Sequence, residues 1–485
     1  MTLALAWFTP FGAFPDELDH YERALSIGNG ELVGTPDPEP PIAVHKKTCC
    51  ASGNPSALAW VRQGVRLVEV DADQQPERLP CNQVVTSARL TCGAATTSER
   101  QANAMGTIEP VAYAPGGLIA NLFHSPTAAY RATRLAPALL GLVLLAVGLF
   151  ALQRRFRSPA VFASVVTSMS LGTLAVLASG SPNTFEIAGT VCVLAGGLAL
   201  ADTADPSTAD WWCLGAGGFA LATSRSLGPI WILALLAIAM VLGSWHDVRL
   251  HVRANRRAAI TVATIVGLGA ASTAAWEAAV QPHVAFDLGF FVHQIGPSIG
   301  DAGFASRQFF AAVGALPPAL FAWAWGALTL TVVASGVIVG DRRARRAIVV
   351  AAFLLVGAFV GVSAAVLRQN GFGIQARHVL PVAIALCVAG GVAWRDRVPP
   401  LWASLAAGAL AAGLLVFAWG FLRTSYVATP VGLALAPTTW RDALHALRSF
   451  PSALFVAGAA LAGASIPLSA WRSGFAAPRD ARQDG

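Results

Sequence analysis

Charged residues are scarce in this sequence. Only 12% of its 485 residues are Asp, Glu, Lys or Arg, whereas soluble domains carry about a quarter. This shortage excludes an ordinary soluble domain. In their place 55% of the residues are hydrophobic, and several apolar runs reach the roughly 20 residues needed to cross a bilayer core of about 30 Å. We therefore expect an all-α polytopic membrane protein in contact with the lipid bilayer.

Two sequence motifs of soluble enzymes are also missing. There is no P-loop and no HExxH pair, which argues against a P-loop nucleotide site and a zincin-type zinc site. No repeat relates the two halves of the chain, which argues against the common inverted-repeat transporter folds. The formal charge is +7, but the basic residues occur in short runs between apolar segments, as the positive-inside rule produces. No nucleic-acid partner is expected.

Apolar windows divide the chain into a short start, a polar loop domain and a helix bundle of about 11–12 transmembrane helices. Residues 1–14 make a helix of only about 20 Å, too short to span, so we expect a truncated first helix whose reading frame begins upstream. Residues 15–130 form the loop domain, 131–472 the bundle, with an amphipathic interfacial helix near 438–450, and 473–485 a tail. The windows in the bundle are 132–152, 159–179, 184–201, 211–224, 227–243, 258–280, 309–339, 347–367, 378–394, 400–422 and 453–471.

Lys and Arg predict the orientation. The basic runs at 153–157, 247–257, 341–346 and 394–397 fall on one side if the spans alternate, and that side is cytoplasmic by the positive-inside rule. The C-terminal tail then lies in the cytoplasm and the loop domain outside it. We expect a multi-pass membrane protein with this orientation.

The loop domain is expected to be α/β or to contain β-strands. "GVRLVEVDA" at 64–72 alternates like a strand, and "CNQVVTSARLTC" at 81–92 is a candidate partner. Cys81 and Cys92 end that second segment, and outside the cytoplasm they would form a disulfide. Cys49 and Cys50 are adjacent, and their state stays open.

An acidic stretch, "PDELDHYER", follows the first apolar run. Asp16 and His20 are spaced i,i+4, so on a helix they share a face. Such a pair, with Glu17 beside it, could hold a divalent cation, Mg²⁺ or Mn²⁺, or act as a base with an orienting partner. The alternative is a helix start at the membrane surface whose charges are simply solvated.

Basic residues at span ends on the outer side form a second group. Arg225, Arg368, Arg377 and His378 lie where the positive-inside rule disfavours arginine, and guanidinium binds phosphate through two parallel hydrogen bonds. Snorkelling to lipid headgroups is the competing interpretation. Glu186 is a lone acid just inside a span, either facing a functional cavity or placed at a helix N-terminus.

Five motifs in order resemble a bacterial family of predicted membrane proteins with a domain of unknown function, and the resemblance implies a location in a bacterial plasma (inner) membrane. The family signature PDExxH reads here Pro15-Asp16-Glu17-Leu18-Asp19-His20, and the paired cysteines resemble actinobacterial members. At 375–378 the chain reads Gln-Ala-Arg-His where the family has Gln-Gly-Arg-Tyr. The other four motifs are "YAPGGLIANLF" (113–123), "SPNTFEIAG" (181–189), "SRSLGPIW" (224–231) and "GIQARHVLPV" (373–382).

The architecture of that family is similar to the GT-C glycosyltransferases. The resemblance implies an enzyme that transfers a sugar from a polyprenyl-phosphate donor to an envelope glycan or lipid acceptor on the outer face. Asp16 would be the base, with Glu17 and His20 as orienting or metal partners. Arg377, with Arg225 or Arg368, would hold the donor phosphate. Two other classes stay open: a transporter or flippase of a lipid-linked glycan, and a non-catalytic envelope protein.

Overall fold

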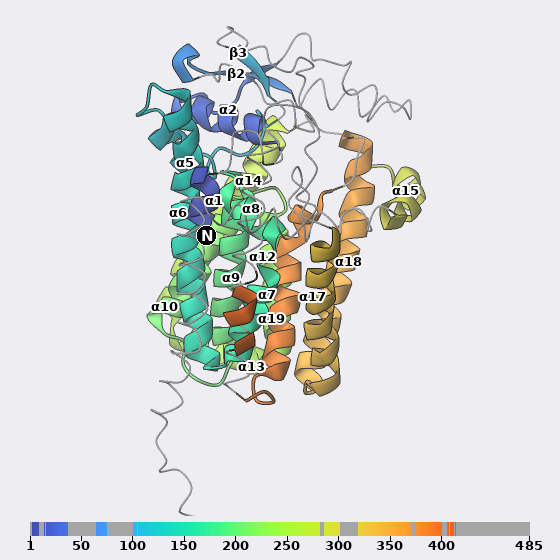
Figure 1. Ribbon diagram of the computed structural model, residues 1–485. Helices are drawn as coiled ribbons and strands as arrows, with labels where there is room; N and C mark the ends of the chain where they lie inside the picture. The colour runs from blue at the N-terminus through green and yellow to red at the C-terminus, as the bar shows by residue number, and fades with distance from the viewer. Residues whose placement is uncertain are drawn as a thin grey trace, which may run out of the picture.

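The chain is mostly helical, with long helices in a bundle and a small mixed module at one end of it (Figure 1). The predicted fold class, a helical membrane protein with a β-containing segment after the first helix, is confirmed in these terms. The computed structural model describes residues 2–8, 14, 16–36, 65–74, 100–103, 105–281, 286–300, 319–370, 374–399, 405–406, 408–411 and 413.

Five helices in the described part of the chain are long and apolar enough to cross a membrane, or up to seven spans if two bent helix pairs are counted. The bend is 76° between α7 and α8 and 110° between α12 and α13. The predicted windows 400–422 and 453–471 lie largely or wholly outside the described residues. The five helices are α6 (Pro126–Phe156), α9 (Asn183–Leu200), α14 (Arg256–Val280), α18 (Arg342–Asn370), and η3 (Ala376–Val379) continued by α19 (Leu380–Trp394).

The remaining elements of the bundle are not among these five. The window predicted at 211–224 corresponds to a continuous helical run from Thr208 to Ala222 with a π-helical turn in its middle. The elements are α1 (Thr2–Phe8), α7 (Pro159–Ser168), α8 (Leu171–Ala178), α10 (Thr208–Trp212), η2 (Cys213–Gly217), α11 (Gly218–Ala222), α12 (Gly228–Leu242), α13 (Trp245–Ala254), α15 (Leu288–Gly300) and α17 (Ala319–Val339).

Helix α9 is the centre of the bundle. All of its residues are buried, as expected for a helix that is apolar all round and surrounded by others. The outer helices instead expose large apolar side chains, such as Val143 and Phe150 on α6 and Phe353 and Val356 on α18. Apolar surface of this extent on helices long enough to span fits contact with lipid.

The module at one end combines two helices and a small sheet. The sheet order is β1-β2-β3 and both pairs are antiparallel. The strand expected within 64–72 is present as β2, whereas its expected partner at 81–92 lies outside the described residues. The elements are α2 (Glu17–Gly28), β1 (Thr35–Pro36), β2 (Arg66–Glu69), η1 (Ala72–Gln74), β3 (Arg100–Asn103) and α5 (Ala114–Ala120).

Two adjacent glycines let α5 fit between α2 and α6. A Cβ at Gly117 would lie 2.0 Å from the carbonyl oxygen of Ala24 on α2, and one at Gly116 would lie 2.9 Å from that of Thr133 on α6. Neither position has room for a side chain, so only glycine allows this approach. The position of α2 over the bundle depends on it.

The module is also tied to α14. The indole N–H of Trp276 and the side-chain amide of Gln281 both donate to the carbonyl oxygen of Thr107, at 2.7 and 2.9 Å. Thr273 donates to the Glu109 carboxylate at 2.5 Å. These contacts place the end of α14 beside the module.

The basic segments gather at the opposite end of the bundle. Arg154, at the end of α6, pairs with Asp210 of α10 at 2.8 Å. Ser158, before α7, donates to the carbonyl oxygen of Arg395, which follows α19. Figure 1 shows α10 and α13 at this end and α2 with the strands at the other. The separation of the basic segments from the module is what alternating spans predict.

Candidate functional site

Asp16 lies directly before α2 in a left-handed conformation, with φ 54° and ψ 21°. Asp and Asn adopt this region more readily than other residues with a side chain. The carboxylate does not cap α2, but accepts a hydrogen bond and ion pair from Nη2 of Arg377. Residues 361 positions apart are therefore brought together, and the Asp16 side chain is 5% exposed.

Three of the four outer basic residues meet at this point. Arg377 and His378 belong to η3, and Arg225 lies in the turn between α11 and α12. Nη1 of Arg225 donates to Nε2 of His378 at 3.2 Å. Arg377 thus contacts Asp16 before α2, and Arg225 contacts His378 in η3; a shared anionic ligand stays a prediction. The fourth, Arg368, is in α18, and its side chain lies outside the described part.

Glu186 belongs to the same region. It is 1% exposed, accepts a hydrogen bond from the side-chain amide of Asn183 in the first turn of α9, and interacts electrostatically with Arg225 and Arg377. Glu186 lies in the first turn of α9, as one of the two interpretations expects, and its role in a functional cavity stays a prediction.

Several buried donors in this cluster have no acceptor among the described residues. They are Nε and Nη2 of Arg225 and Nε of Arg377, and the buried Nε2 of His20 also lacks a partner there. Buried N–H groups are normally paired, and guanidinium can only donate. A ligand with several acceptor oxygens, such as a phosphate, would satisfy this arrangement. We call Asp16, His20, Arg225, Arg377 and His378 the arginine cluster.

His20 faces the cluster from α2. It is 2% exposed, and its Nδ1 lies 2.7 Å from the hydroxyl of Tyr113. Burial, with the nearby charges of Arg377 and Arg225, lowers the pKa of His20 from 6.5 to about 3. His20 is thus neutral at physiological pH. Tyr113, 1% exposed, was not identified as a site residue from the sequence, although it begins one of the family motifs.

This pKa predicts how stability depends on pH. Between about pH 3 and 6.5 an unfolded chain protonates His20 and the native one does not, so the free energy of unfolding falls as pH falls below 6.5, by on the order of 1.4 kcal/mol per pH unit from this residue. Thermal unfolding of wild type and His20→Gln between pH 7 and 4.5 isolates the contribution. The variant should lose less stability than wild type on acidification. An equal loss of stability in the two proteins would contradict the prediction.

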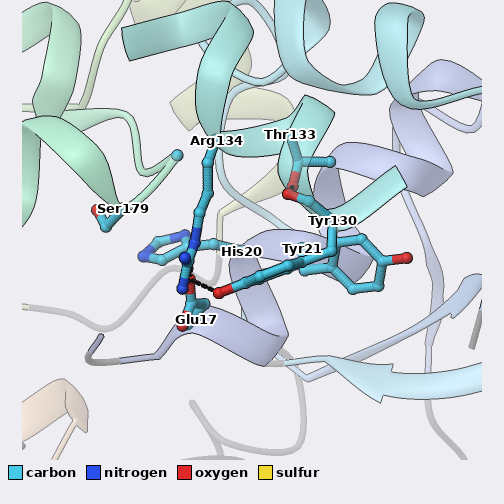
Figure 2. Close-up of a pocket in the computed structure, with 8 residues that line it drawn as sticks. Glu17, His20, Tyr21, Tyr130, Thr133, Arg134 and Ser179 are labelled. Carbon is cyan, nitrogen blue, oxygen red and sulfur yellow. Dashed lines mark hydrogen bonds and ion pairs between the residues drawn. The ribbon is translucent and has the colours of Figure 1, made fainter. Parts of the chain in front are cut away.

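Glu17 is held by α6 rather than beside Asp16. Its carboxylate forms a buried ion pair with Arg134 and accepts a hydrogen bond from the hydroxyl of Tyr130 at 2.9 Å. The backbone N–H of Phe14 donates to its other oxygen at 3.3 Å. Figure 2 shows Arg134 and Tyr130 reaching from α6 to this carboxylate. The role expected for Glu17, orienting Asp16 or sharing a metal, is replaced by anchoring the start of α2.

A small pocket lies along this contact (Figure 2). His20 is among its lining residues, so the pocket adjoins the imidazole as well as the anchor. The lining residues are Glu17, His20, Tyr21, Tyr130, Thr133, Arg134, Ser179 and Gly180.

Comparison with known proteins identifies the family. Residues 1–386 match the family described as predicted membrane protein (DUF2142). The chain belongs to the DUF2142 family. No curated protein matches this DUF2142 chain.

Two solved structures of ArnT from Cupriavidus metallidurans are similar to parts of the DUF2142 chain. The apo structure has 19% identity and a TM-score of 0.38, and the match covers 77% of this chain and 66% of that one, just under two thirds. The structure bound to undecaprenyl phosphate has 16% identity and a TM-score of 0.40, with 94% and 73% covered.

The surroundings of Asp16 and His20 in the arginine cluster of this DUF2142 protein disfavour a divalent cation. The described residues include no group of three or more His, Cys, Asp or Glu that could hold a metal. Of the expected ligands, Asp16 pairs with Arg377 and Nδ1 of His20 contacts Tyr113. Two guanidinium groups beside this pair repel a cation. The metal site at Asp16 and His20 remains a prediction made from the sequence, and no step below uses it.

Other features predicted from the sequence lie outside the arginine cluster of the DUF2142 chain. Cys81 and Cys92, like Cys49 and Cys50, lie outside the described residues, as does the interfacial helix at 438–450. The pentapeptide at 296–300 matches the nucleophile motif GxSxG, but it lies within α15. The motif needs a sharp turn between strand and helix to expose its serine, so it carries no chemistry here.

Proposed function

We propose that this protein is a membrane glycosyltransferase that transfers a sugar from a polyprenyl-phosphate donor to an envelope glycan or lipid acceptor on the outer face. The observation that carries the proposal is the arginine cluster. It combines a carboxylate at Asp16 with two arginines whose remaining buried N–H groups have no acceptor among the described residues. The resemblance to GT-C enzymes noted from the sequence supports the same reaction.

In this reaction an acceptor hydroxyl oxygen attacks the anomeric carbon of the sugar. A carbon–oxygen bond forms on one face while the bond to the phosphate oxygen breaks on the other, so the configuration inverts. The proton of the acceptor passes to Asp16, and the electron pair of the broken bond leaves with the phosphate. General-base assistance of this kind contributes about 10²–10⁴-fold.

Arg225 and Arg377 would stabilise the charge that develops on the leaving phosphate. Guanidinium matches phosphate with two parallel hydrogen bonds, and donors already in place need no rearrangement as charge appears. Arg377 contacts the proposed base in the ligand-free protein. A phosphate that takes over part of its hydrogen bonding would leave the Asp16 carboxylate available to the acceptor.

The location of the cluster supports the outer face. The cluster joins α2 to the ends of bundle helices at the module end, opposite the end where Arg154 and Arg395 lie. If the basic end is cytoplasmic, as the positive-inside rule favours, the cluster faces outward at the depth of lipid headgroups. A lipid-borne donor and a water-borne acceptor can meet there.

The direct test follows the leaving group. The purified full chain in liposomes would be incubated with polyprenyl-phosphate sugars, and released polyprenyl phosphate measured with and without added acceptor. Release that depends on Asp16 supports the transferase. Movement of the intact lipid-linked sugar across the bilayer with no release would instead support a flippase that uses the same arginines.

Arg377 offers a sharper test of phosphate recognition. Replacing it by Lys keeps the charge but removes the planar fork of donors, so Arg377→Lys should weaken binding of undecaprenyl phosphate nearly as much as Arg377→Ala. Equilibrium binding in nanodiscs measures both. Arg397 lies at the other end of the bundle, so Arg397→Lys is the matched control and should bind undecaprenyl phosphate normally. Full affinity in Arg377→Lys with loss in Arg377→Ala would show that a simple surface charge suffices.

A further inference from the structure

The contact between His20 and Tyr113 determines where the imidazole carries its proton. Both side chains are almost fully buried, and the hydroxyl lies 2.7 Å from Nδ1. Within the described residues this is the only side-chain hydrogen bond of the Tyr113 hydroxyl. If Nδ1 donated, both the buried phenolic proton and the unprotonated Nε2 would lack partners there, whereas with the hydroxyl donating only Nε2–H lacks one, and unsatisfied buried polar groups are costly. The hydroxyl therefore donates, and Nδ1 accepts.

The ring proton of His20 must then be on Nε2. A neutral imidazole has one N–H and one acceptor nitrogen, and Nδ1 is the acceptor. The doubly protonated form is disfavoured because the ring is buried close to Arg377 and Arg225. The residue therefore presents a single neutral donor, Nε2–H.

That donor is buried and has no acceptor in the part of the chain that the structure describes. The neighbouring guanidinium atoms, Nε and Nη2 of Arg225 and Nε of Arg377, are in the same situation. All four are N–H groups, so among the described residues the cluster has more hydrogen-bond donors than acceptors. A bound phosphate oxygen would fill this need for His20 as it would for the arginines.

We propose that His20 is a neutral hydrogen-bond donor to the bound phosphate and that Tyr113 holds it in the Nε2–H tautomer. The proposal rests on the phosphate site of the proposed function, but not on sugar transfer. It makes His20 a binding residue instead of a base or a metal ligand, because Nδ1 is engaged by Tyr113 and Nε2 carries the proton. Tyr113 is a positioning residue that acts through His20.

His378 provides an internal control with the opposite tautomer. Arg225 can only donate, so Nε2 of His378, which receives the Nη1–H of Arg225 at 3.2 Å, must be an acceptor. Its proton is then on Nδ1 when the ring is neutral. Two neighbouring imidazoles should thus give opposite signals in one sample.

Solid-state ¹⁵N NMR of histidine-labelled full chain in liposomes tests the tautomers, because protonated and unprotonated ring nitrogens have well-separated shifts. His20→Gln and His378→Gln assign the two residues. Wild-type protein should show His20 protonated on Nε2 and His378 on Nδ1. In Tyr113→Phe the His20 signal should become a mixture of tautomers while His378 is unchanged. A wild-type His20 protonated on Nδ1 overturns the proposal without any variant.

A second arm tests the ligand. Undecaprenyl phosphate should shift the Nε2 resonance of His20, and undecaprenol, which lacks the phosphate, should not. Inorganic phosphate shows whether the headgroup alone suffices. His20→Phe should bind undecaprenyl phosphate about tenfold more weakly. No shift with either phosphate, or an equal shift with undecaprenol, overturns the proposal.

The two arms separate this inference from the proposed reaction. Preparations that shift His20 with undecaprenyl phosphate but never release it from a sugar donor would contradict the glycosyltransferase and leave the donor role intact. Preparations that transfer sugar without any response at His20 would contradict the donor role alone.

Discussion

Asp16→Asn is expected to lower turnover of a polyprenyl-phosphate sugar at least about a hundredfold while leaving the protein folded and inserted. The backbone at Asp16 is left-handed, with φ 54°, and Asn tolerates this region as Asp does. The amide keeps the size of the carboxylate and can still accept from Arg377, but it cannot take a proton from the acceptor hydroxyl. The measurement is the rate of polyprenyl phosphate release in liposomes.

Two variants make this result specific to the carboxylate. Asp71→Asn removes an exposed acid of the same module and should retain full activity. Both variants give up the ion pair with Arg377, and Asp16→Ala also adds backbone strain in the left-handed region, so it should be less stable than Asp16→Asn. An active Asp16→Asn protein would rule out Asp16 as the base, and the flippase would then be better supported than the glycosyltransferase.

The second large effect is expected at the anchor of α2. Glu17 and Arg134 form an ion pair with side chains that are 2% and 1% exposed. Removing one partner of a buried pair leaves an uncompensated charge and destabilises a protein by about 3–5 kcal/mol. Glu17→Gln and Arg134→Met should each lower the unfolding temperature strongly, as measured by thermal unfolding in detergent or nanodiscs.

A double-mutant cycle separates the pair from its surroundings. Glu17→Gln combined with Arg134→Met removes both charges, so the double variant should be less destabilised than the sum of the two single variants. The matched control is the exposed pair of Arg395 and Asp396, where loss of a partner should cost no more than about 1 kcal/mol. Additive effects at Glu17 and Arg134 would show that the ion pair is not what holds α2.

The stretch from Asp16 to His20 illustrates how far sequence reasoning could reach. The spacing indicated a helix start with functional acids, and α2 does begin at Glu17. What the spacing suggested about partners was less accurate, because it considered only neighbours along the chain. Asp16 and Glu17 are adjacent, yet one contacts η3 and the other α6, since successive residues at a helix start point in different directions.

Tyr113 shows why part of the site could not be found in advance. It lies 93 residues from His20, in a segment with no charge pattern of its own. Its nearness to His20 depends on α5 fitting between α2 and α6 at Gly116 and Gly117. Nothing local in either segment encodes that contact.

The amino-acid sequence alone identifies a helical membrane protein, because a scarcity of charge and runs of about 20 apolar residues leave a bilayer-spanning helix as the stable state. It also determined which helix ends are basic and which residues could carry chemistry. Only the tertiary structure decided that Asp16, Arg225, Arg377 and His378 meet beside His20 and Tyr113, while Glu17 turns to Arg134. The physical reason is that buried charges and donors must find partners, and those partners come from helices that are distant in sequence and adjacent only after packing.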